Sequence, residues 1–535
     1  MKGDASADLR DAETPDEVIV NTEARVPDFD PTLGIMVKLD AIKGTCTNKL
    51  VTIGDSVTMG FQSGAIHNTR ISWPKIVAAE VGGDPAFRFP LFDGYGGLPL
   101  NIEYLLRAIE HKYGTEISWW ELPAAGFELR HQMALIEDYW ERGAGARAPI
   151  TSAIMHNLAV YGWDIRDVLS RTAKNLKDAM VKPKDDLFSQ VVENANIRAA
   201  LGVYSSMDDT DTLLDAARTL GEQGALPGSG GDAATPGIET LVVFLGANNI
   251  LGTVTRLKVS WSDKNYNKIG KEKDSYTAWR PSHFKSEYLL LVAELEKINA
   301  QHVILINVPH VTIAPVARGV AKKVSPRSRY FTFYTRPWIS DTQFNAAEDP
   351  NITDNQARAI DSAIDQYNEL IATVVKQQRL AGKDWYVLDM AGVMDRAAAR
   401  RYINDIAARP GWWTEYELPA ALKALNPKPD STFFLSNPQG RLQGGLFSLD
   451  GIHPTTIAYG LIAQEVINIM QLAKVPFYHN DGVTLRQGPV QVDFERLIRL
   501  DSLISNPPAT LTSDMKTLGW LDEMGDFFGK LNPFS

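Results

Sequence analysis

Residues 50–56 have the sequence LVTIGDS, and this stretch decides the class of fold. It begins as a short apolar run, which is typical of a buried strand, and it ends at a Gly-Asp-Ser turn. Similar apolar runs occur at 153–160, 241–245, 303–306 and 385–388, and helical patterns occur at 73–81, 282–299, 353–380 and 455–472. Apolar strands that alternate with helices indicate a parallel sheet covered on both faces. We therefore predict a three-layer α/β/α domain around a central parallel sheet.

The longest predicted helix, 353–380, carries its own start and stop signals. Thr353 and Gln356 have the spacing of a capping box at its beginning, and Gly382 follows its end. Apolar side chains recur along it at helical spacing, so we expect one of its faces to be buried.

The 535-residue chain divides into three predicted parts. Residues 1–48 are polar and acidic, and we expect an N-terminal arm with little regular structure. Residues 49–475 hold the α/β domain, with connections too long to be simple, so we expect mostly helical insertions near 84–150, 182–236 and 393–445. Residues 476–535 form a C-terminal extension, whose apolar stripe from Met515 to Leu531 predicts a helix packed on the body.

The composition argues against several classes of partner. Lys and Arg total 54 against 65 Asp and Glu, which gives a net charge of −11 without a long basic run. We therefore expect no binding to nucleic acid or to anionic lipid. No apolar stretch is long enough to span a bilayer, so no integral membrane segment is expected. The single cysteine, Cys46, excludes an intramolecular disulfide and a cysteine-based metal or iron–sulfur site.

The first residues of the chain, MKGD, lack the apolar core of a secretory signal. We therefore expect a cytoplasmic protein, although a secreted protein whose signal had been removed would have the same sequence. No pattern in the sequence indicates an oligomeric state.

Ser56 and His453 are the first candidates for chemistry. Ser56 comes directly after an apolar strand, and ligand sites in parallel sheets lie beyond the carboxyl ends of the strands. The alternative is a serine that caps the next helix. Asp450 precedes His453 by three residues, so one tight turn can place its carboxylate on the imidazole Nδ1–H and leave Nε2 free as a base. The alternative is an aspartate at a helix start with a histidine nearby by chance.

Asn248 and Gly162 are candidates for stabilising a developing oxyanion. Asn248 follows the apolar run at 241–245, and its side-chain amide is a neutral hydrogen-bond donor. Gly162 follows the run at 153–160, and a glycine there can lend its backbone N–H to a site without a Cβ in the way. The alternatives are an ordinary turn asparagine and an ordinary glycine at the end of a strand.

Taken together, these residues occur in the order Ser, Gly, Asn, Asp-x-x-His, and their local motifs resemble the SGNH (GDSL-like) hydrolase family of lipase and esterase type. The matching segments are 54–56 (GDS), Gly162, 246–248 (GAN) and 450–454 (DGIHP). The resemblance implies a flavodoxin-like sheet with the nucleophile after its first strand. It also implies catalytic roles for Ser56, Asp450 and His453, with an oxyanion hole formed by Ser56, Gly162 and Asn248.

The chain departs from the family pattern in two respects. Val57 stands where the family usually has leucine, which changes only a packing position. The intervals from Ser56 to Gly162 and from Asn248 to His453 are long for the family, so we expect the additional residues to shape the substrate pocket.

Other catalytic motifs are absent from the sequence. It contains no Gly-x-Ser-x-Gly elbow, no Walker phosphate loop, no complete dinucleotide fingerprint and no His-Glu-x-x-His motif. The remaining histidines have no metal-ligand spacing, so we expect neither a metal nor a cofactor.

The expected function is hydrolysis of a carboxylic ester, on a small molecule or a lipid, through an acyl-enzyme on Ser56 with His453 as base. A carbohydrate O-deacetylase or an acyltransferase with the same site stays an open alternative. The transferase differs only in the acceptor that reaches the acyl-enzyme. An alternative of a different class is a catalytically inactive binding or scaffold protein on the same fold. The presence of all four residues Ser56, Asn248, Asp450 and His453 argues against that alternative.

Overall fold

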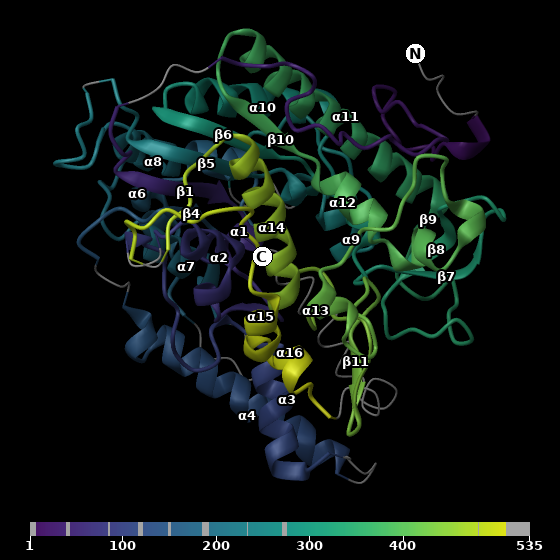
Figure 1. Ribbon diagram of the computed structural model, residues 1–535. Helices are drawn as coiled ribbons and strands as arrows, with labels where there is room; N and C mark the ends of the chain where they lie inside the picture. The colour runs from purple at the N-terminus through teal and green to yellow at the C-terminus, as the bar shows by residue number, and fades with distance from the viewer. Residues whose placement is uncertain are drawn as a thin grey trace.

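A five-stranded parallel sheet forms the centre of the protein (Figure 1). The computed structural model describes residues 7–38, 43–83, 86–115, 121–147, 151–183, 192–232, 234–269, 275–479 and 481–509. The strands are β1 (Asn48–Gly54), β4 (Asn157–Ala159), β5 (Ile238–Phe244), β6 (Ala300–Ile306) and β10 (Trp385–Leu388). Their spatial order is β10-β6-β5-β1-β4, and every neighbouring pair is parallel. The predicted α/β class with a central parallel sheet is confirmed.

Helices cover both faces of this sheet. On one face α2 (Trp73–Glu80) packs against α14 (Thr456–Leu472), and these helices contact β1 and β10. The other face is covered by α8 (Leu213–Gly221), α5 (Ile165–Ser170), α10 (Pro281–Leu295) and α11 (Asp354–Leu380), and in this order each helix contacts the next (Figure 1). The three layers explain why the carboxyl-terminal half of β5, residues 241–244, is apolar without interruption, since both faces of the strand are buried.

Local signals set the boundaries of most elements. Thr353 and Gln356 form the predicted capping box, in which each side chain accepts a hydrogen bond from the backbone N–H of the other residue. The strand predicted at 153–160 is shorter than expected, because β4 covers only Asn157–Ala159. His156, which precedes β4, forms hydrogen bonds outside the sheet: its N–H donates to Arg88 O (2.8 Å), and the Arg88 N–H donates to His156 Nδ1 (2.9 Å).

Smaller elements surround the three layers. Further helices are α1 (Ser56–Met59), α3 (Ile102–Tyr113), α4 (Leu122–Glu141), α6 (Ala173–Ala179), α7 (Ala195–Val203), α9 (Gly252–Thr255), α12 (Met390–Arg396) and α13 (Ala420–Lys423). Two-stranded ribbons pair β2 (Ala65–Ile66) with β3 (Leu98–Pro99) and β11 (Leu435–Asn437) with β12 (Gly440–Gln443). A three-stranded antiparallel sheet of β7 (Arg318–Lys323), β8 (Phe331–Thr335) and β9 (Ile352–Thr353) was not predicted.

The stretches predicted as insertions differ in their relation to the sheet. Residues 84–150 contribute α3 and α4, which pack against each other. The stretch 182–236 is not only a decoration, because its α8 contacts β1 and β4 and belongs to the layer that covers the sheet. Its side chains Leu213 and Leu220 are fully buried.

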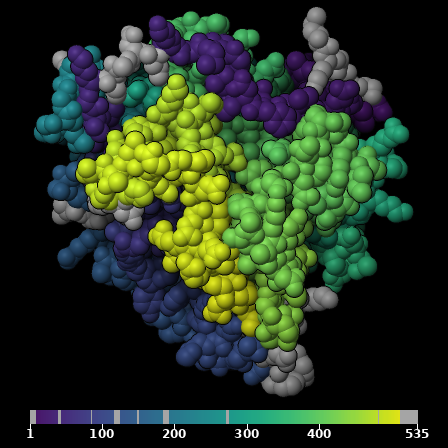
Figure 2. Space-filling model, viewed as in Figure 1, coloured from purple at the N-terminus to yellow at the C-terminus, as the bar shows by residue number. Residues whose placement is uncertain are grey.

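Both ends of the described chain lie against the body. The described residues of the N-terminal arm are largely irregular, but Val18 and Val20 are fully buried, and Pro31 O accepts a hydrogen bond from the Val387 N–H of the edge strand β10. Figure 2 shows the arm, in purple, running over the upper part of the molecule. At the other end, α15 (Phe494–Leu500) packs against α14 and is followed by α16 (Ser502–Ser505). The predicted helical stripe from Met515 to Leu531 lies outside the described residues.

Candidate active site

The candidate residues gather where the strand order of the sheet reverses. Numbered along the chain, the strands have the order 2-1-3-4-5, so the reversal lies between β1 and β5. In doubly wound sheets, ligands bind at such a point beyond the carboxyl ends of the strands. Ser56 follows β1 and Asn248 follows β5, so the two residues flank this position.

Ser56 does not cap α1, although helix capping was the alternative role considered for it. Asp55 is the N-cap of α1 instead, and its carboxylate accepts a hydrogen bond from the Val57 N–H at 3.1 Å. The Ser56 hydroxyl lies 2.8 Å from His453 Nε2. Gly54 makes this turn sterically feasible, because a Cβ there would lie 2.2 Å from Thr58 Oγ1.

Asp450 holds the imidazole of His453 from its other side. His453 Nδ1 lies 2.9 Å from Asp450 Oδ2, and the second oxygen, Oδ1, accepts from the backbone N–H groups of Ile452 (2.9 Å) and His453 (2.8 Å). With the proton on Nδ1, Nδ1 donates to the carboxylate and Nε2 accepts from the Ser56 hydroxyl. The tight turn predicted from the Asp-x-x-His spacing therefore exists in the structure.

The environment keeps Asp450 ionised. Burial alone would raise the pKa of this carboxyl group, but the attraction of His453 and the hydrogen bonds donated to it prevail, so its pKa lies below the ordinary value. Asp55 behaves differently, because burial raises its pKa to about 6 against the opposing effects of the Val57 N–H and His453. Two carboxyl groups near one imidazole thus differ in acidity, and Asp450 is the stronger acid of the two.

Asn248 and the turn around Gly162 are joined by a hydrogen bond. Asn248 Nδ2 donates to the carbonyl oxygen of Trp163 at 2.8 Å, which fixes the plane of the amide. The neighbouring Gly162 has φ +73°, a backbone conformation that favours glycine. The Tyr161 N–H lies 3.3 Å from Met59 Sδ, so this turn also packs against α1, the helix that begins at Ser56.

Several supporting residues were missed by the sequence reasoning. The Gly64 N–H donates to Asp450 Oδ2 at 3.0 Å, and Ser448 Oγ donates to Asp450 Oδ1 at 3.3 Å. The Phe61 ring lies against the imidazole of His453, with ring centroids 4.4 Å apart. The contacts of Gly64 and Phe61 join residues nearly 400 positions apart in the chain, and no local motif marks them.

Asn196 of α7 was also missed, although it supports the turn that carries Gly162. Its Nδ2 donates to Tyr161 O at 2.6 Å, and its Oδ1 accepts from Trp163 Nε1 at 3.1 Å. The long stretch between β4 and β5 therefore braces the turn on which Asn248 also depends.

The Asn-x-Pro motif at 307–309 has a structural role in this chain. Asn307 Nδ2 donates to Asp389 Oδ1 at 2.7 Å, and Asn307 Oδ1 accepts from the Ala391 N–H at 2.9 Å. The motif thus ties the end of β6 to the start of α12. Within the described residues, no group of three His, Cys, Asp or Glu side chains is arranged to hold a metal ion.

The chain matches no protein-family model, and no curated protein matches its sequence. In the described part of the chain, no helix has both the length and the apolar character required to cross a membrane.

Proposed function

We propose that this protein is a serine hydrolase of the SGNH (GDSL-like) family that cleaves carboxylic esters. The observation that carries the proposal is the hydrogen-bonded series from Ser56 Oγ to His453 Nε2 (2.8 Å) and from His453 Nδ1 to Asp450 Oδ2 (2.9 Å). Its position supports the same conclusion, because it lies at the reversal of a sheet whose strand order is that of flavodoxin-like folds.

In the proposed mechanism, Ser56 Oγ attacks the carbonyl carbon of the ester while His453 Nε2 takes the hydroxyl proton. Asp450 stabilises the imidazolium that forms. The backbone N–H groups of Ser56 and Gly162 and the amide of Asn248 donate to the oxyanion of the tetrahedral intermediate. Collapse of this intermediate expels the alcohol, which receives the proton from His453, and leaves Ser56 acylated. Water then attacks the acyl group, with His453 as base, and the acid is released.

The test is covalent labelling by a fluorophosphonate together with ester hydrolysis. The wild type, Ser56→Ala and His453→Ala are compared on p-nitrophenyl acetate and on a long-chain p-nitrophenyl ester. We expect labelling and turnover in the wild type and loss of both in the two variants, since the nucleophile and its base act as a unit.

Two exposed residues provide matched controls for these variants. Ser286→Ala and His111→Ala remove the same side chains from the surfaces of α10 and α3 and should leave labelling and turnover unchanged. Turnover that survives Ser56→Ala in a folded protein would contradict the assignment. Absence of both labelling and turnover in the folded wild type would favour the binding or scaffold alternative.

A further inference from the structure

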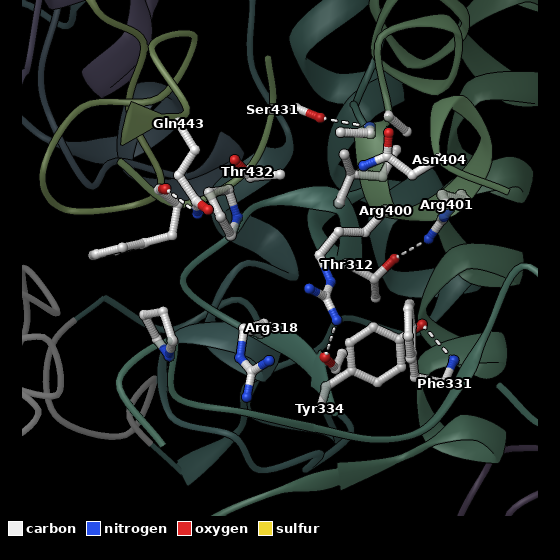
Figure 3. Close-up of a pocket in the computed structure, with 18 of the residues that line it drawn as sticks. Thr312, Arg318, Phe331, Tyr334, Arg400, Arg401, Asn404, Ser431, Thr432 and Gln443 are labelled. Atoms are coloured by element: carbon white, nitrogen blue, oxygen red, sulfur yellow. Dashed lines mark hydrogen bonds between the residues drawn. The ribbon is translucent and has the colours of Figure 1, made fainter. Parts of the chain in front are cut away.

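A cavity of about 540 Å³ lies on the side of the molecule that carries β7, β8 and residues 398–404 (Figure 3). Residues 431–433, Leu435 and Gln443 also line it, as do side chains from the segments 312–317 and 337–343. None of Ser56, Asn248, Asp450 and His453 lines it. It is therefore separate from the candidate active site and needs an explanation of its own.

The wall of this cavity is rich in positive charge although the protein as a whole is acidic. Four arginines line it, Arg318, Arg329, Arg400 and Arg401, against a single acidic residue, Asp341. Arg401 is neutralised from behind, because it forms ion pairs with Asp361 (2.9 Å) and Asp395 (3.3 Å). Arg329 is also attracted by Asp361, and one of its terminal nitrogens donates to Thr22 O at 3.3 Å. We therefore consider Arg318 and Arg400 as the positive groups available to a ligand.

Arg400 has no carboxylate partner within ion-pair distance among the described residues. One of its terminal nitrogens donates to Gly319 O at 2.7 Å, whereas its Nε is buried without a hydrogen-bond partner. Burial, and then the positive charge of Arg318, lower the pKa of the Arg400 guanidinium. The group nevertheless stays charged, because arginine does not lose its proton in proteins. Asp341 attracts this guanidinium only from beyond ion-pair distance, so the partly buried charge is incompletely compensated, and a bound anion would stabilise it.

Arg318 adds a second, incompletely paired guanidinium. Its Nη1 contacts Asp341 at 2.6 Å, but that carboxylate is 54% exposed, and the Arg318 Nε is buried without a partner. Figure 3 shows the Arg318 and Arg400 side chains extending into the same space, between Gln443 and Tyr334. Two guanidinium groups around one space suit an oxyanion such as a carboxylate or a phosphate.

The rest of the cavity fits the organic part of a ligand. Phe331, Tyr334 and Phe433 contribute aromatic surface, and the Arg400 guanidinium lies 5.0 Å from the centroid of the Phe331 ring. The side chains of Asn404, Thr432 and Gln443 add hydrogen-bonding groups. The volume exceeds what one small inorganic anion would fill.

We propose that this cavity binds an organic anion, with its carboxylate or phosphate group between Arg318 and Arg400 and its apolar body against Phe331, Tyr334 and Phe433. The proposal rests on this cavity alone and does not depend on catalysis by Ser56.

The experiment is isothermal titration calorimetry of the full-length protein with benzoate and phenyl phosphate. Benzyl alcohol serves as the uncharged comparison, and acetate and inorganic phosphate serve as anions without an aromatic body. We expect benzoate or phenyl phosphate to bind more tightly than all three. Arg400→Gln and Arg318→Gln should each weaken that binding about tenfold or more, since each removes a charge-assisted hydrogen bond. The control Arg327→Gln, at an exposed turn between β7 and β8, should bind as the wild type does.

A conservative variant and two folding measurements complete the experiment. Arg400→Lys keeps the charge and should bind better than Arg400→Gln, and circular dichroism and thermal melting verify that each variant is folded. The proposal is overturned if neither aromatic anion binds the wild type up to about 10 mM, the range of weak small-ligand binding. It is also overturned if benzyl alcohol binds equally well, or if folded Arg400→Gln and Arg318→Gln retain wild-type affinity.

Discussion

Ser56 and Asp55 have separate roles at the end of β1, although both are residue types that commonly cap helices. Asp55 accepts the Val57 N–H in the first turn of α1, and the Ser56 hydroxyl lies against His453. In the second motif, Asp450 Oδ1 accepts from backbone N–H groups, and Oδ2 lies against both His453 Nδ1 and the Gly64 N–H. Both aspartates thus satisfy backbone N–H groups beside the two candidate side chains.

Asn248→Ala tests the oxyanion role at this scale. The substitution removes the amide that donates to Trp163 O and, in the proposed mechanism, to the oxyanion. We expect kcat for p-nitrophenyl acetate to fall roughly 10²–10³-fold, which corresponds to about 3–4 kcal/mol, with a small change in KM. Asn265→Ala, at an exposed position, is the control. An unchanged kcat in folded Asn248→Ala would remove this residue from the mechanism.

Asp450→Asn tests the orientation of His453. Both carboxylate oxygens of Asp450 accept hydrogen bonds, so an amide NH₂ in either position faces a donor. The histidine then loses its tautomer and its charge partner, and we expect kcat to fall about 10⁴-fold. Steady-state kinetics with the exposed Asp481→Asn as control measures the effect. A rise in KM with normal kcat would instead assign Asp450 to substrate binding.

At the scale of elements, helices and strands were predicted correctly from the sequence where the signals that set them are local. The helix 353–380 and the strand 303–306 were predicted from capping and apolar runs alone, and the structure has them as α11 and within β6. The strand predicted at 153–160 is longer than β4, because the backbone N–H and the Nδ1 of His156 form hydrogen bonds with the backbone of Arg88, nearly 70 residues away. The same limit applies to Asn196, whose role depends on contacts that no local pattern encodes.

Thr353→Ala tests how much the capping box contributes to α11. The side chain of Thr353 accepts a hydrogen bond from the Gln356 N–H at the first turn of a 27-residue helix. Its loss should lower the free energy of unfolding by about 1 kcal/mol. Urea denaturation measures the change, with Thr342→Ala as the control, because Thr342 is exposed and caps no helix. Equal effects in the two variants would mean that the cap contributes nothing of its own.

At the scale of the whole molecule, Arg25 fastens the N-terminal arm to the body. Its guanidinium pairs with Asp389 and lies 3.6 Å from Asp365, and all three side chains are largely buried. Arg25→Ala leaves Asp389 without its cation, whereas Asp365 keeps His310 at 3.0 Å, and the substitution should lower the free energy of unfolding by about 2–4 kcal/mol. The exposed pair of Arg70 and Asp93 is the matched comparison, and Arg70→Ala should change stability by less than about 1 kcal/mol. Similar losses in both variants would show that the arm is not held by this ion pair.

Asp501 makes the stability of the whole protein depend on pH. It is fully buried and accepts the Ile457 N–H (2.9 Å) at the start of α14, and burial, reinforced by Glu103, raises its pKa to about 7. An unfolded aspartate has a pKa of about 4, so between about pH 4 and 7 the folded protein keeps a proton that the unfolded chain has lost. The contribution of Asp501 is therefore complete below about pH 4 and disappears as the pH rises to about 7.

Asp501→Asn removes this titration. The difference in unfolding free energy between wild type and Asp501→Asn should decline by roughly 3–4 kcal/mol as the pH rises through this window, and it should be constant above it. Urea denaturation from pH 4.5 to 8 measures it. Asp481→Asn is the control, because hydrogen bonds from Thr484 lower the pKa of that exposed carboxyl to about 2 and keep it ionised throughout the range. If the difference in unfolding free energy for Asp501→Asn is as independent of pH as that for the control, the pKa of Asp501 is the ordinary one. The hydrogen bond from α14, which lowers this pKa, would then offset the burial that raises it.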